Sequence, residues 1–512
     1  MKKLFLLICI FIVLQNVSAQ SKATDLTILK TEDKTIINKH IYGHFAEHLG
    51  KCIYGGLFVG EDSNISNTKG VRNDIIRALQ ELKVPNLRWP GGCFADTYHW
   101  KDGIGPKKDR PSIVNRWWGG TVEDNSFGTN EFLDMCEAIG AEPYLAGNVG
   151  SGSPHELDEW VQYVNYQPGS PMSDLRKKNG REKPWGVSLW GVGNEMWGCG
   201  GNMTAEFYAN LYRQYATFIP DTKGGKKLFR IASGANGDDY HWTEVLMRDI
   251  PKGLIEAVAL HWYSVANWDR KGSSTKFDES QYFQTMTAAV KIEELVQKHS
   301  QIMDKYDPEK KIALIVDEWG AWYDTEEGAS ALYQQNTMRD AMIAGVTLNV
   351  FNNHADRVKG ANLAQIVNVL QAVILTDKEK MVLTPTYHVM KMYNVHQDAL
   401  LIPLEIESPK YIFDKKELPA VSASASKDKA GVTHFSLVNI DLKKENKVKI
   451  NLKELGIKSI KAEVLSSSKV QDYNTFENPN KIIPVLFNKF SIKNDTLEVT
   501  IPPFSLVVLE GK

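Results

Sequence analysis

Short apolar runs recur between residues 41 and 395, and most of them end in polar or acidic residues. Eight such runs can be read from the sequence: Ile41–Glu47, Val84–Pro90, Glu142–Asn148, Val187–Glu195, Phe229–Ala235, Ala257–Tyr263, Ile312–Glu318 and Thr347–His354. Stretches with helical spacing separate them, for example Asn73–Leu82, Asn130–Ile139, Ala205–Phe218 and Phe283–His299. Nearly continuous apolar strands that alternate with helices indicate a parallel sheet covered on both faces. Eight such units predict an α/β fold, a (β/α)8 TIM barrel over residues 41–395.

A doubly wound open sheet is the alternative for this region, and it is disfavoured because no Gly-rich phosphate-binding fingerprint opens a helix. After residue 396 the pattern changes to alternating, β-branched segments: Val432–Ile440, Lys447–Leu452, Ala462–Leu465, Thr496–Ile501 and Ser505–Leu509. This pattern predicts an additional all-β sandwich domain over residues 396–512. The segment Thr27–Ile37 also alternates, so we expect residues 20–40 to join that domain.

The first nineteen residues have the pattern of a secretory signal peptide. Lys2 and Lys3 precede an unbroken apolar run, Leu4–Leu14, and Val17-Ser18-Ala19 supplies a small-x-small cleavage pattern. Eleven apolar residues are too few to span a bilayer. We therefore expect residues 1–19 to be removed, the protein to be exported to the periplasm or the extracellular space, and no stable membrane insertion to remain.

Composition narrows the function classes. Hydrophobic residues make up 43% and charged residues 24% of the chain, which is an ordinary globular balance. The formal net charge of −2 gives no basic field for nucleic acid. The 13 Trp and 19 Tyr residues suit stacking on sugar rings, although large cores also use aromatic residues. The cysteines outside the signal show no zinc-type spacing and are read as buried hydrophobes, with any pairing left open; no metal or cofactor is expected.

Three of the apolar runs end in a glutamate, and two of these have a setting that suggests chemistry: the fourth ends in Asn194-Glu195 and the seventh in Asp317-Glu318. In a TIM barrel the chemistry lies at the carboxyl ends of the strands, and a charge there is costly unless partners or chemistry justify it. A carboxyl pair across the barrel mouth suits glycoside hydrolysis. Each glutamate alone could equally be a helix-cap partner or a salt bridge. Trp319 and Trp322 are candidate pocket walls or packing residues.

The sequence resembles the α-L-arabinofuranosidases of glycoside hydrolase family 51 over essentially the whole mature chain. The stretches that carry the resemblance are Ile41–Gly50, Leu87–Gly92, Gly193–Glu195, Asp317–Trp319, and Asn353–Asp356 together with Ala364–Asn368. The resemblance implies a retaining, exo-acting enzyme that removes terminal non-reducing arabinofuranosyl residues from arabinan, arabinoxylan or arabino-oligosaccharides. It also suggests a homo-oligomer, for which no sequence feature gives proof.

The resemblance also implies roles for particular residues. Glu195 would be the general acid and then the base, and Glu318 the nucleophile. Arg88 would orient the nucleophile, and Tyr263 would hydrogen-bond to it. The expected substrate-binding set is Glu47, Arg88, Cys93, Trp118, Asn194, Tyr263 and Gln365. Whether His48, His261 and His354 are catalytic or structural is left open by the sequence.

Cys93 is a departure from the family pattern, because many members place Asn after the Arg-Trp-Pro-Gly-Gly run. A cysteine is a poor hydrogen-bond partner for a sugar. Either Cys93 lines the pocket, or a nearby group such as Asp96 takes over the contact. Two other functions stay open: another barrel glycosidase of the same clan, such as an endo-β-glycanase, and a carbohydrate-binding scaffold with a degenerate barrel.

Overall fold

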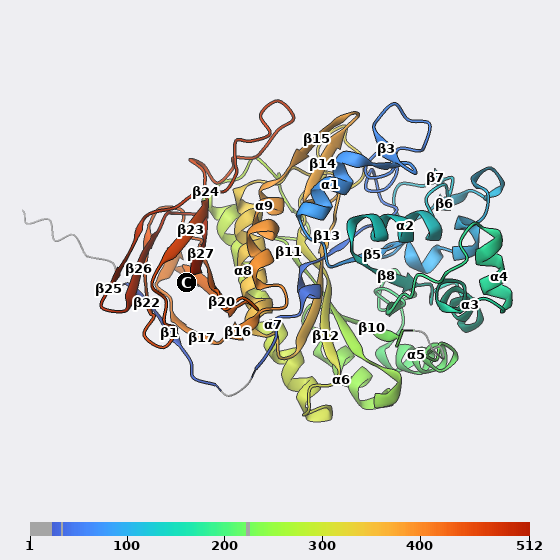
Figure 1. The fold of residues 1–512 in the computed structure, drawn as a ribbon, viewed down its shortest axis with the longest axis horizontal. Coiled ribbons are helices and arrows are strands. Elements are labelled where there is room, and N and C mark those ends of the chain that lie inside the picture. Colours follow the sequence, from blue (N-terminus) through green and yellow to red (C-terminus); the bar gives the residue numbers. More distant parts are fainter. Residues whose placement is uncertain (1–22, 32–33, 222–225) are drawn as a thin grey trace, which may run out of the picture.

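The computed structural model describes residues 23–31, 34–221 and 226–512. The expected signal peptide, residues 1–19, lies outside the described residues. Within the described residues the chain forms a closed parallel barrel and a sheet-rich C-terminal domain beside it (Figure 1). None of the helices in these ranges is both long and apolar enough to cross a membrane. The closed barrel and the sheet-rich domain beside it confirm the predicted fold class.

Eight strands from the described residues close the barrel. In chain order they are β2 (Gly43–Phe45), β5 (Asn86–Trp89), β8 (Glu142–Gly147), β9 (Leu189–Val192), β10 (Phe229–Asn236), β11 (Ala257–Ser264), β12 (Ala313–Ala321) and β13 (Val358–Ala364). Each strand pairs in parallel with the next one, and β13 closes the ring on β2. All four residues of β5 and all nine of β12 are buried, as expected for parallel strands covered on both faces.

Helices follow most of the strands and cover the outside of the barrel (Figure 1). They are α1 (Asn73–Glu81), α2 (Thr129–Ile139), α3 (Pro154–Asn165), α4 (Pro171–Lys178), α5 (Ala205–Phe218), α6 (Tyr240–Asp249), α7 (Glu279–Tyr306), α8 (Met338–Asn353) and α9 (Pro385–Met392). The predicted helices at α1, α2 and α5 agree to within one residue at each end. The helix predicted over Phe283–His299 extends further, because Asp278 caps its start by accepting from Gln281 N.

The eighth strand was predicted at the wrong place. Residues 347–354, expected as a strand, belong mostly to α8, and the true eighth strand is β13. Helix α8 contacts β12 on the barrel side and β20, β21 and β27 of the C-terminal domain on the other side. Because every residue from 338 to 352 is buried, this helix has no solvent-exposed face, and its sequence lacks the one-sided polar pattern that distinguishes a surface helix from a buried strand.

The C-terminal domain consists of two sheets. One has the strand order β17 (Leu404–Glu407), β1 (Thr24–Ile28), β22 (Asn446–Asn451), β26 (Thr496–Ile501) and β25 (Phe490–Lys493). The other has the order β16 (Leu400–Ile402), β20 (Val421–Lys427), β21 (Thr433–Asn439), β27 (Ser505–Gly511), β23 (Ile460–Leu465) and β24 (Val485–Leu486). Short antiparallel hairpins are formed by β3 (Asn67–Thr68) with β4 (Val71–Arg72), β6 (Ile113–Asn115) with β7 (Thr121–Glu123), β14 (Ile374–Asp377) with β15 (Lys380–Leu383), and β18 (Lys410–Phe413) with β19 (Lys416–Pro419).

The N-terminal segment pairs with this domain, as its alternation suggested. Strand β1 lies between β17 and β22, antiparallel to the first and parallel to the second. The strand is shorter and earlier than the expected Thr27–Ile37, and Ile36 forms only an isolated bridge with Leu400. The chain therefore enters the sheet, leaves it, and then begins the barrel.

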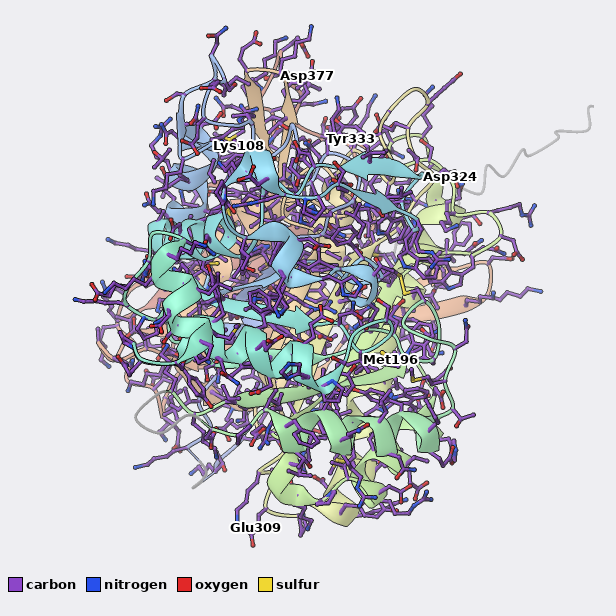
Figure 2. All side chains as sticks on the ribbon, turned by 90° about the vertical axis from the view of Figure 1, so that its right-hand side faces the viewer. Lys108, Met196, Glu309, Asp324, Tyr333 and Asp377 are labelled. Atoms are coloured by element: carbon purple, nitrogen blue, oxygen red, sulfur yellow. A yellow bond between two sulfur atoms is a disulfide. The ribbon has the colours of Figure 1, made fainter. Side chains whose placement is uncertain are left out.

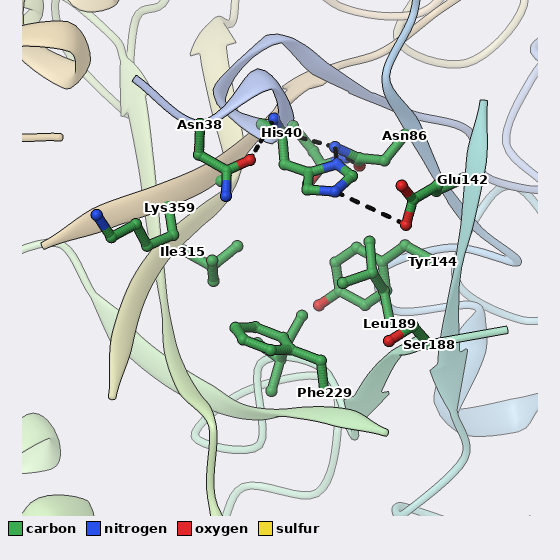
Figure 3. Close-up of a pocket in the computed structure, with 13 residues that line it drawn as sticks. Asn38, His40, Asn86, Glu142, Tyr144, Ser188, Leu189, Phe229, Ile315 and Lys359 are labelled. Atoms are coloured by element: carbon green, nitrogen blue, oxygen red, sulfur yellow. Dashed lines mark hydrogen bonds and ion pairs between the residues drawn. The ribbon is translucent and has the colours of Figure 1, made fainter. Parts of the chain in front are cut away.

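A cavity of about 260 Å³ opens at the amino ends of the barrel strands (Figure 3). Its lining includes Asn86, Glu142, Leu189 and Phe229, which are the first residues of four barrel strands. The ring of Tyr144 also lines this cavity. The glutamates picked out in the sequence lie at the opposite, carboxyl ends of the strands, where barrel chemistry is expected.

Candidate active site

Glu195 sits on a tight turn directly after β9. Gly193 (φ 80°) and Glu195 (φ 43°) both adopt the left-handed region, which is costly for a glutamate. Strained residues of this kind concentrate at functional sites. Asp96 stabilises this turn, because its Oδ2 accepts a hydrogen bond from Asn194 N at 2.9 Å. The backbone therefore fixes the direction of the Glu195 side chain.

Glu195 and Glu318 face one another across the barrel mouth. One carboxylate oxygen of each, together with a ring nitrogen of His261, lies within 4.8 Å of the others. Retaining glycosidases hold their two carboxyl groups about 5–5.5 Å apart, whereas inverting enzymes need about 6.5–9.5 Å. A separation within 4.8 Å is closer to that of retaining enzymes than to the wider gap of inverting enzymes.

Glu318 is held by two donors, Arg88 on β5 and Tyr263 on β11. Arg88 Nη1 donates to Glu318 Oε1 at 2.9 Å, and the Tyr263 hydroxyl donates to Oε2 at 2.9 Å. Arg88 Nη2 donates to Asn194 Oδ1 at 2.5 Å, so one buried guanidinium bonds to groups at the ends of both β9 and β12. Gly92 is required beside this carboxylate, because a Cβ there would lie 2.8 Å from Glu318 Oε1.

His261 and Asp317 complete the charged cluster. His261 Nδ1 lies 2.9 Å from Glu195 Oε1, and its Nε2 lies 3.1 Å from Asp317 Oδ1. Burial opposes a charge on His261, but Glu318 and then the bonds to Asp317 and Glu195 raise its pKa to about 10. Burial likewise opposes ionisation of Asp317, yet Arg88 and His261 hold its pKa below the ordinary value.

Burial raises the pKa of Glu195, and the nearby Glu318 charge acts in the same direction, against the opposing bond from His261. A raised pKa is what a general acid needs at neutral pH. The cluster therefore contains one carboxyl that favours its proton, Glu195, and one that is kept ionised, Asp317.

Trp118 and Gln365 both bond to Glu47. Glu47 Oε1 accepts from Trp118 Nε1 at 3.0 Å and from the backbone N–H of Gly92 and of Phe94, each at 3.0 Å. Gln365 Nε2 donates to Glu47 Oε2 at 3.2 Å. Trp118 lies in the turn of the β6–β7 hairpin, at residues 116–120. The N–H edge of its ring contacts Glu47.

Cys93 is bonded to Cys199, which the sequence left undecided. The two Cα atoms are 5.5 Å apart, and the loops involved follow β5 and β9. Cys199 Sγ lies 3.5 Å from Glu195 Oε2. Cys52 and Cys136 are buried free thiols, as expected. Cys93 therefore lies beside Glu195 as half of a disulfide.

Several other candidates lie outside the reacting cluster. Asp96 does not replace the missing Asn: it is buried and accepts from the backbone N–H of Val149, Gly150 and Asn194. His48 is buried and accepts from Trp89 Nε1, and His354 pairs with Glu293 on α7. Trp319 is 2% exposed and packs on Phe351, so it is a core residue. Trp322 packs edge-on against Tyr263 at 5.2 Å and against Trp268 at 5.6 Å.

Three members of the site were not singled out from the sequence: Asp317, Cys199 and Tyr144, whose hydroxyl donates to Asp317 Oδ2 at 2.7 Å. Asp317 directly precedes Glu318, and Cys199 follows Glu195 by four residues, so adjacency was the available signal.

Figure 2 views the barrel from the side opposite the C-terminal domain. Met196, next to Glu195, and Asp324, beyond the end of β12, lie on the same side of that view.

Comparison with known proteins assigns the family. Residues 78–282 match the family described as the α-L-arabinofuranosidase 1 domain, and residues 317–505 match the α-L-arabinofuranosidase C-terminal domain. A Bacteroides ovatus protein named intracellular exo-α-L-arabinofuranosidase is 52% identical over 499 residues, 97% of this chain and 96% of the relative. An Emericella nidulans α-L-arabinofuranosidase C is 32% identical, over 85% of this chain and 88% of the relative.

The expected export is contradicted by the Bacteroides ovatus relative, which matches nearly the full length of this chain and is named an intracellular enzyme. Two lysines followed by eleven apolar residues have the composition of a signal peptide. Composition does not determine whether such a segment is recognised and cleaved, and for this reason the interpretation as an export signal was wrong.

Solved structures agree with the family models. The family 51 arabinofuranosidase of Xanthomonas axonopodis pv. citri superposes with a TM-score of 0.94 at 44% identity, covering 96% of this chain and 100% of that one. The α-L-arabinofuranosidase of Thermotoga maritima, solved as an arabinose complex, gives 0.83 at 32% identity, covering 95% of this chain and 99% of that one. The chain belongs to the α-L-arabinofuranosidases of glycoside hydrolase family 51.

Proposed function

We propose that this exo-acting α-L-arabinofuranosidase works by retaining double displacement, with Glu318 as nucleophile and Glu195 as acid and then base. The observation that carries the proposal is the distance across the mouth, where carboxylate oxygens of the two residues lie within 4.8 Å. This gap supports a covalent arabinosyl-enzyme over direct attack by water, because an inverting enzyme leaves room for a water molecule.

In the first step Glu318 attacks the anomeric carbon while Glu195 protonates the departing oxygen. The N–H of Arg88 and the O–H of Tyr263 bond to the Glu318 carboxylate and aim it. His261 occupies Glu195 Oε1, so the transferable proton belongs on Oε2. In the second step Glu195 removes a proton from water, which hydrolyses the ester on Glu318.

Recognition of the furanose is assigned to Glu47, Asn194 and Gln365. Glu47 Oε1 already accepts from two backbone N–H groups and from Trp118, whereas Oε2 has Gln365 as its partner among the described residues. Oε2 is therefore the oxygen left to accept a sugar hydroxyl. Trp118 supplies a wall, and the disulfide at Cys93 forms an apolar border where other members carry Asn.

The natural substrates are proposed to be arabinan, arabinoxylan or arabino-oligosaccharides with terminal arabinofuranosyl groups. Trp322 and the 55% exposed Trp268 stack edge to face, with Lys271 Nζ within 6 Å of both rings. Exposed aromatic faces of this kind suit a sugar on the leaving-group side. The suggested homo-oligomer stays a prediction, which sedimentation analysis of the purified chain would test.

The test compares Glu318→Ala and Glu195→Ala, with Glu318→Gln and Glu195→Gln as isosteric controls. Glu318→Ala should abolish turnover on both 4-nitrophenyl α-L-arabinofuranoside and an arabino-oligosaccharide. Glu195→Ala should lose roughly 10²- to 10⁴-fold on the oligosaccharide and much less on the nitrophenyl substrate, because nitrophenolate needs little protonation. The reverse pattern would exchange the two roles.

A second measurement follows the anomer released from the oligosaccharide by NMR. Retention gives the α-anomer first, and the β-anomer as first product would refute double displacement. Nitrophenyl β-D-xyloside serves as the specificity control. Fast release from the xyloside alone would contradict the assigned sugar recognition.

A further inference from the structure

The disulfide next to the acid/base residue has no part in the proposed reaction. Cys93 lies in the loop after β5 and Cys199 in the loop after β9, with Cα atoms 5.5 Å apart. Cys199 Sγ is 3.5 Å from Glu195 Oε2 and 3.9 Å from Asn194 Nδ2. A disulfide sulfur carries no proton, so neither contact can be a bond donated by sulfur. The Cys199 sulfur therefore lies beside the oxygen to which the reacting proton is assigned, and the Cys93 sulfur is bonded to it.

We propose that reduction converts this pair into a binding site for a thiophilic divalent cation such as Zn²⁺ or Cd²⁺. The ligands are the thiolates of Cys93 and Cys199 and the carboxylate of Glu195. One ligand atom of each of these residues lies within 4.8 Å of the others, and all three side chains are only partly buried. The inference rests on the proposed role of Glu195 for its effect on turnover, and on the sulfur geometry alone for binding.

The chemistry of the three ligands fits such a cation. Two thiolates and one carboxylate are a ligand set that zinc accepts in tetrahedral sites, with Zn–S distances of about 2.3 Å and Zn–O distances of about 2.0–2.2 Å. The fourth position would face the pocket and hold water. His261, at 2.9 Å from Glu195 Oε1, leaves Oε2 free for the metal and fixes the plane of the carboxylate.

The redox state of the disulfide determines whether this site can bind a cation. A phosphine reductant and one water convert the bond into two thiols and a phosphine oxide, so that the two electrons go to sulfur. Binding of one divalent cation then displaces the two thiol protons. Reoxidation by a disulfide reagent removes two electrons from the thiolates, reforms the sulfur–sulfur bond and releases the cation.

Occupancy of the site removes the acid. The cation takes the position of the transferable proton on Glu195 Oε2, so turnover should fall roughly 100-fold or more on a substrate with a poor leaving group. A second cluster of Glu195, His261 and Glu318 also lies within 4.8 Å, but it contains no sulfur and does not depend on the redox state. Redox dependence therefore separates the two sites.

The experiment uses the full chain, reduced with tris(2-carboxyethyl)phosphine and then freed of reductant without oxygen. Cd²⁺ is added while the ultraviolet thiolate-to-cadmium absorption is recorded, and Zn²⁺ is added while hydrolysis of an arabino-oligosaccharide is measured. Each protein is compared with its own metal-free rate. The variants are the double substitution Cys93→Ser with Cys199→Ser, and Cys136→Ala as a control, because Cys136 is a buried free thiol on α2.

The reduced wild-type chain and Cys136→Ala should bind one cadmium with thiolate absorption and lose activity in zinc, while the oxidised chain and the double variant should do neither. Absence of thiolate absorption in the reduced wild type, or equal zinc inhibition of the oxidised chain or the double variant, would overturn the proposed site. Thiolate absorption without loss of activity would support the site and instead refute Glu195 as the acid.

Discussion

Replacing Arg88 by Met tests whether one guanidinium organises both catalytic strand ends. The side chain is 1% exposed and donates to Glu318 Oε1, Asn194 Oδ1 and the Asp317 carbonyl, at 2.9, 2.5 and 3.1 Å. Met has a similar length and no donor, so it removes these bonds without opening a large cavity. Tyr263 remains as a donor to Glu318, the proposed nucleophile.

The expected loss of kcat/KM follows from the bond between Arg88 and Glu318, the proposed nucleophile. A hydrogen bond to a charged group contributes about 1.5–3 kcal/mol. At about 1.36 kcal/mol for each factor of ten, kcat/KM should fall roughly 10- to 150-fold, and more if the loss of the Asn194 contact adds to it. Stability should fall too, by about 3–5 kcal/mol, because buried carboxylates lose their cation.

The assay is kcat/KM on 4-nitrophenyl α-L-arabinofuranoside, read beside a thermal melt that establishes folding. Arg88→Lys is the matched control: it keeps the charge but loses the planar fork, so its activity should lie between those of wild type and Met. Tyr263→Phe, which removes only the bond to Glu318 Oε2, tests the same carboxylate if the Met variant fails to fold. A folded Arg88→Met or Tyr263→Phe variant with unchanged kcat/KM would refute the reasoning.

Tyr144→Phe removes the hydroxyl that bonds Asp317 Oδ2 at 2.7 Å, and should lower the unfolding free energy by about 1–3 kcal/mol, seen as a lower melting temperature. Gly345→Ala places a Cβ about 2.7 Å from Leu506 Cδ1, where α8 meets the C-terminal domain, and overpacking there should cost about 1–3 kcal/mol; an unchanged melting temperature would contradict that close contact. His396 is buried between two serine hydroxyls, and burial lowers its pKa to about 3. Below pH 6.5 His396 takes up a proton in the unfolded chain but not in the folded chain. The free energy of unfolding should therefore fall by about 1.4 kcal/mol per pH unit between pH 6 and 4. In melts recorded against pH, His396→Gln should show a shallower slope.

Seven of the eight barrel strands could be predicted from the sequence because apolar residues on a strand buried on both faces leave a short, bounded run. The eighth could not, because α8 is enclosed between β12 and the C-terminal sheets and therefore has no solvent-exposed face. Strand β13 was overlooked for the converse reason: Val358–Ala364 contains Lys359, Gly360 and Asn362, and its short side chains make a weak apolar signal.

The candidate site could be predicted as a set of residues, but the contacts between them could not. Arg88 and Glu318 are 230 positions apart, and their bond depends on where the barrel closes. Register is also irregular where it matters, since bulges lie between Ala259 and His261 and between Val316 and Trp319. A one-residue shift changes which side chains face the interior, and this hid the role of Asp317 beside Glu318.

The charge balance of the cluster explains why these five groups occur together. Asp317 and Glu318 carry two negative charges and Arg88 and His261 two positive ones, so a protonated Glu195 leaves the buried cluster neutral. In the proposed first step Glu195 gives up its proton and becomes negative, while Glu318 loses its charge by forming the ester. The count is again two negative and two positive, with Glu47 outside it, held mostly by neutral N–H donors. Because burying an uncompensated charge is costly, a cluster that stays neutral through this half-reaction avoids that penalty in both states.

The same count predicts that His261→Gln, which removes one positive charge, should impair the enzyme most where Glu195 must ionise, on substrates with poor leaving groups. An equal loss on nitrophenyl and oligosaccharide substrates would show that His261 acts only through packing.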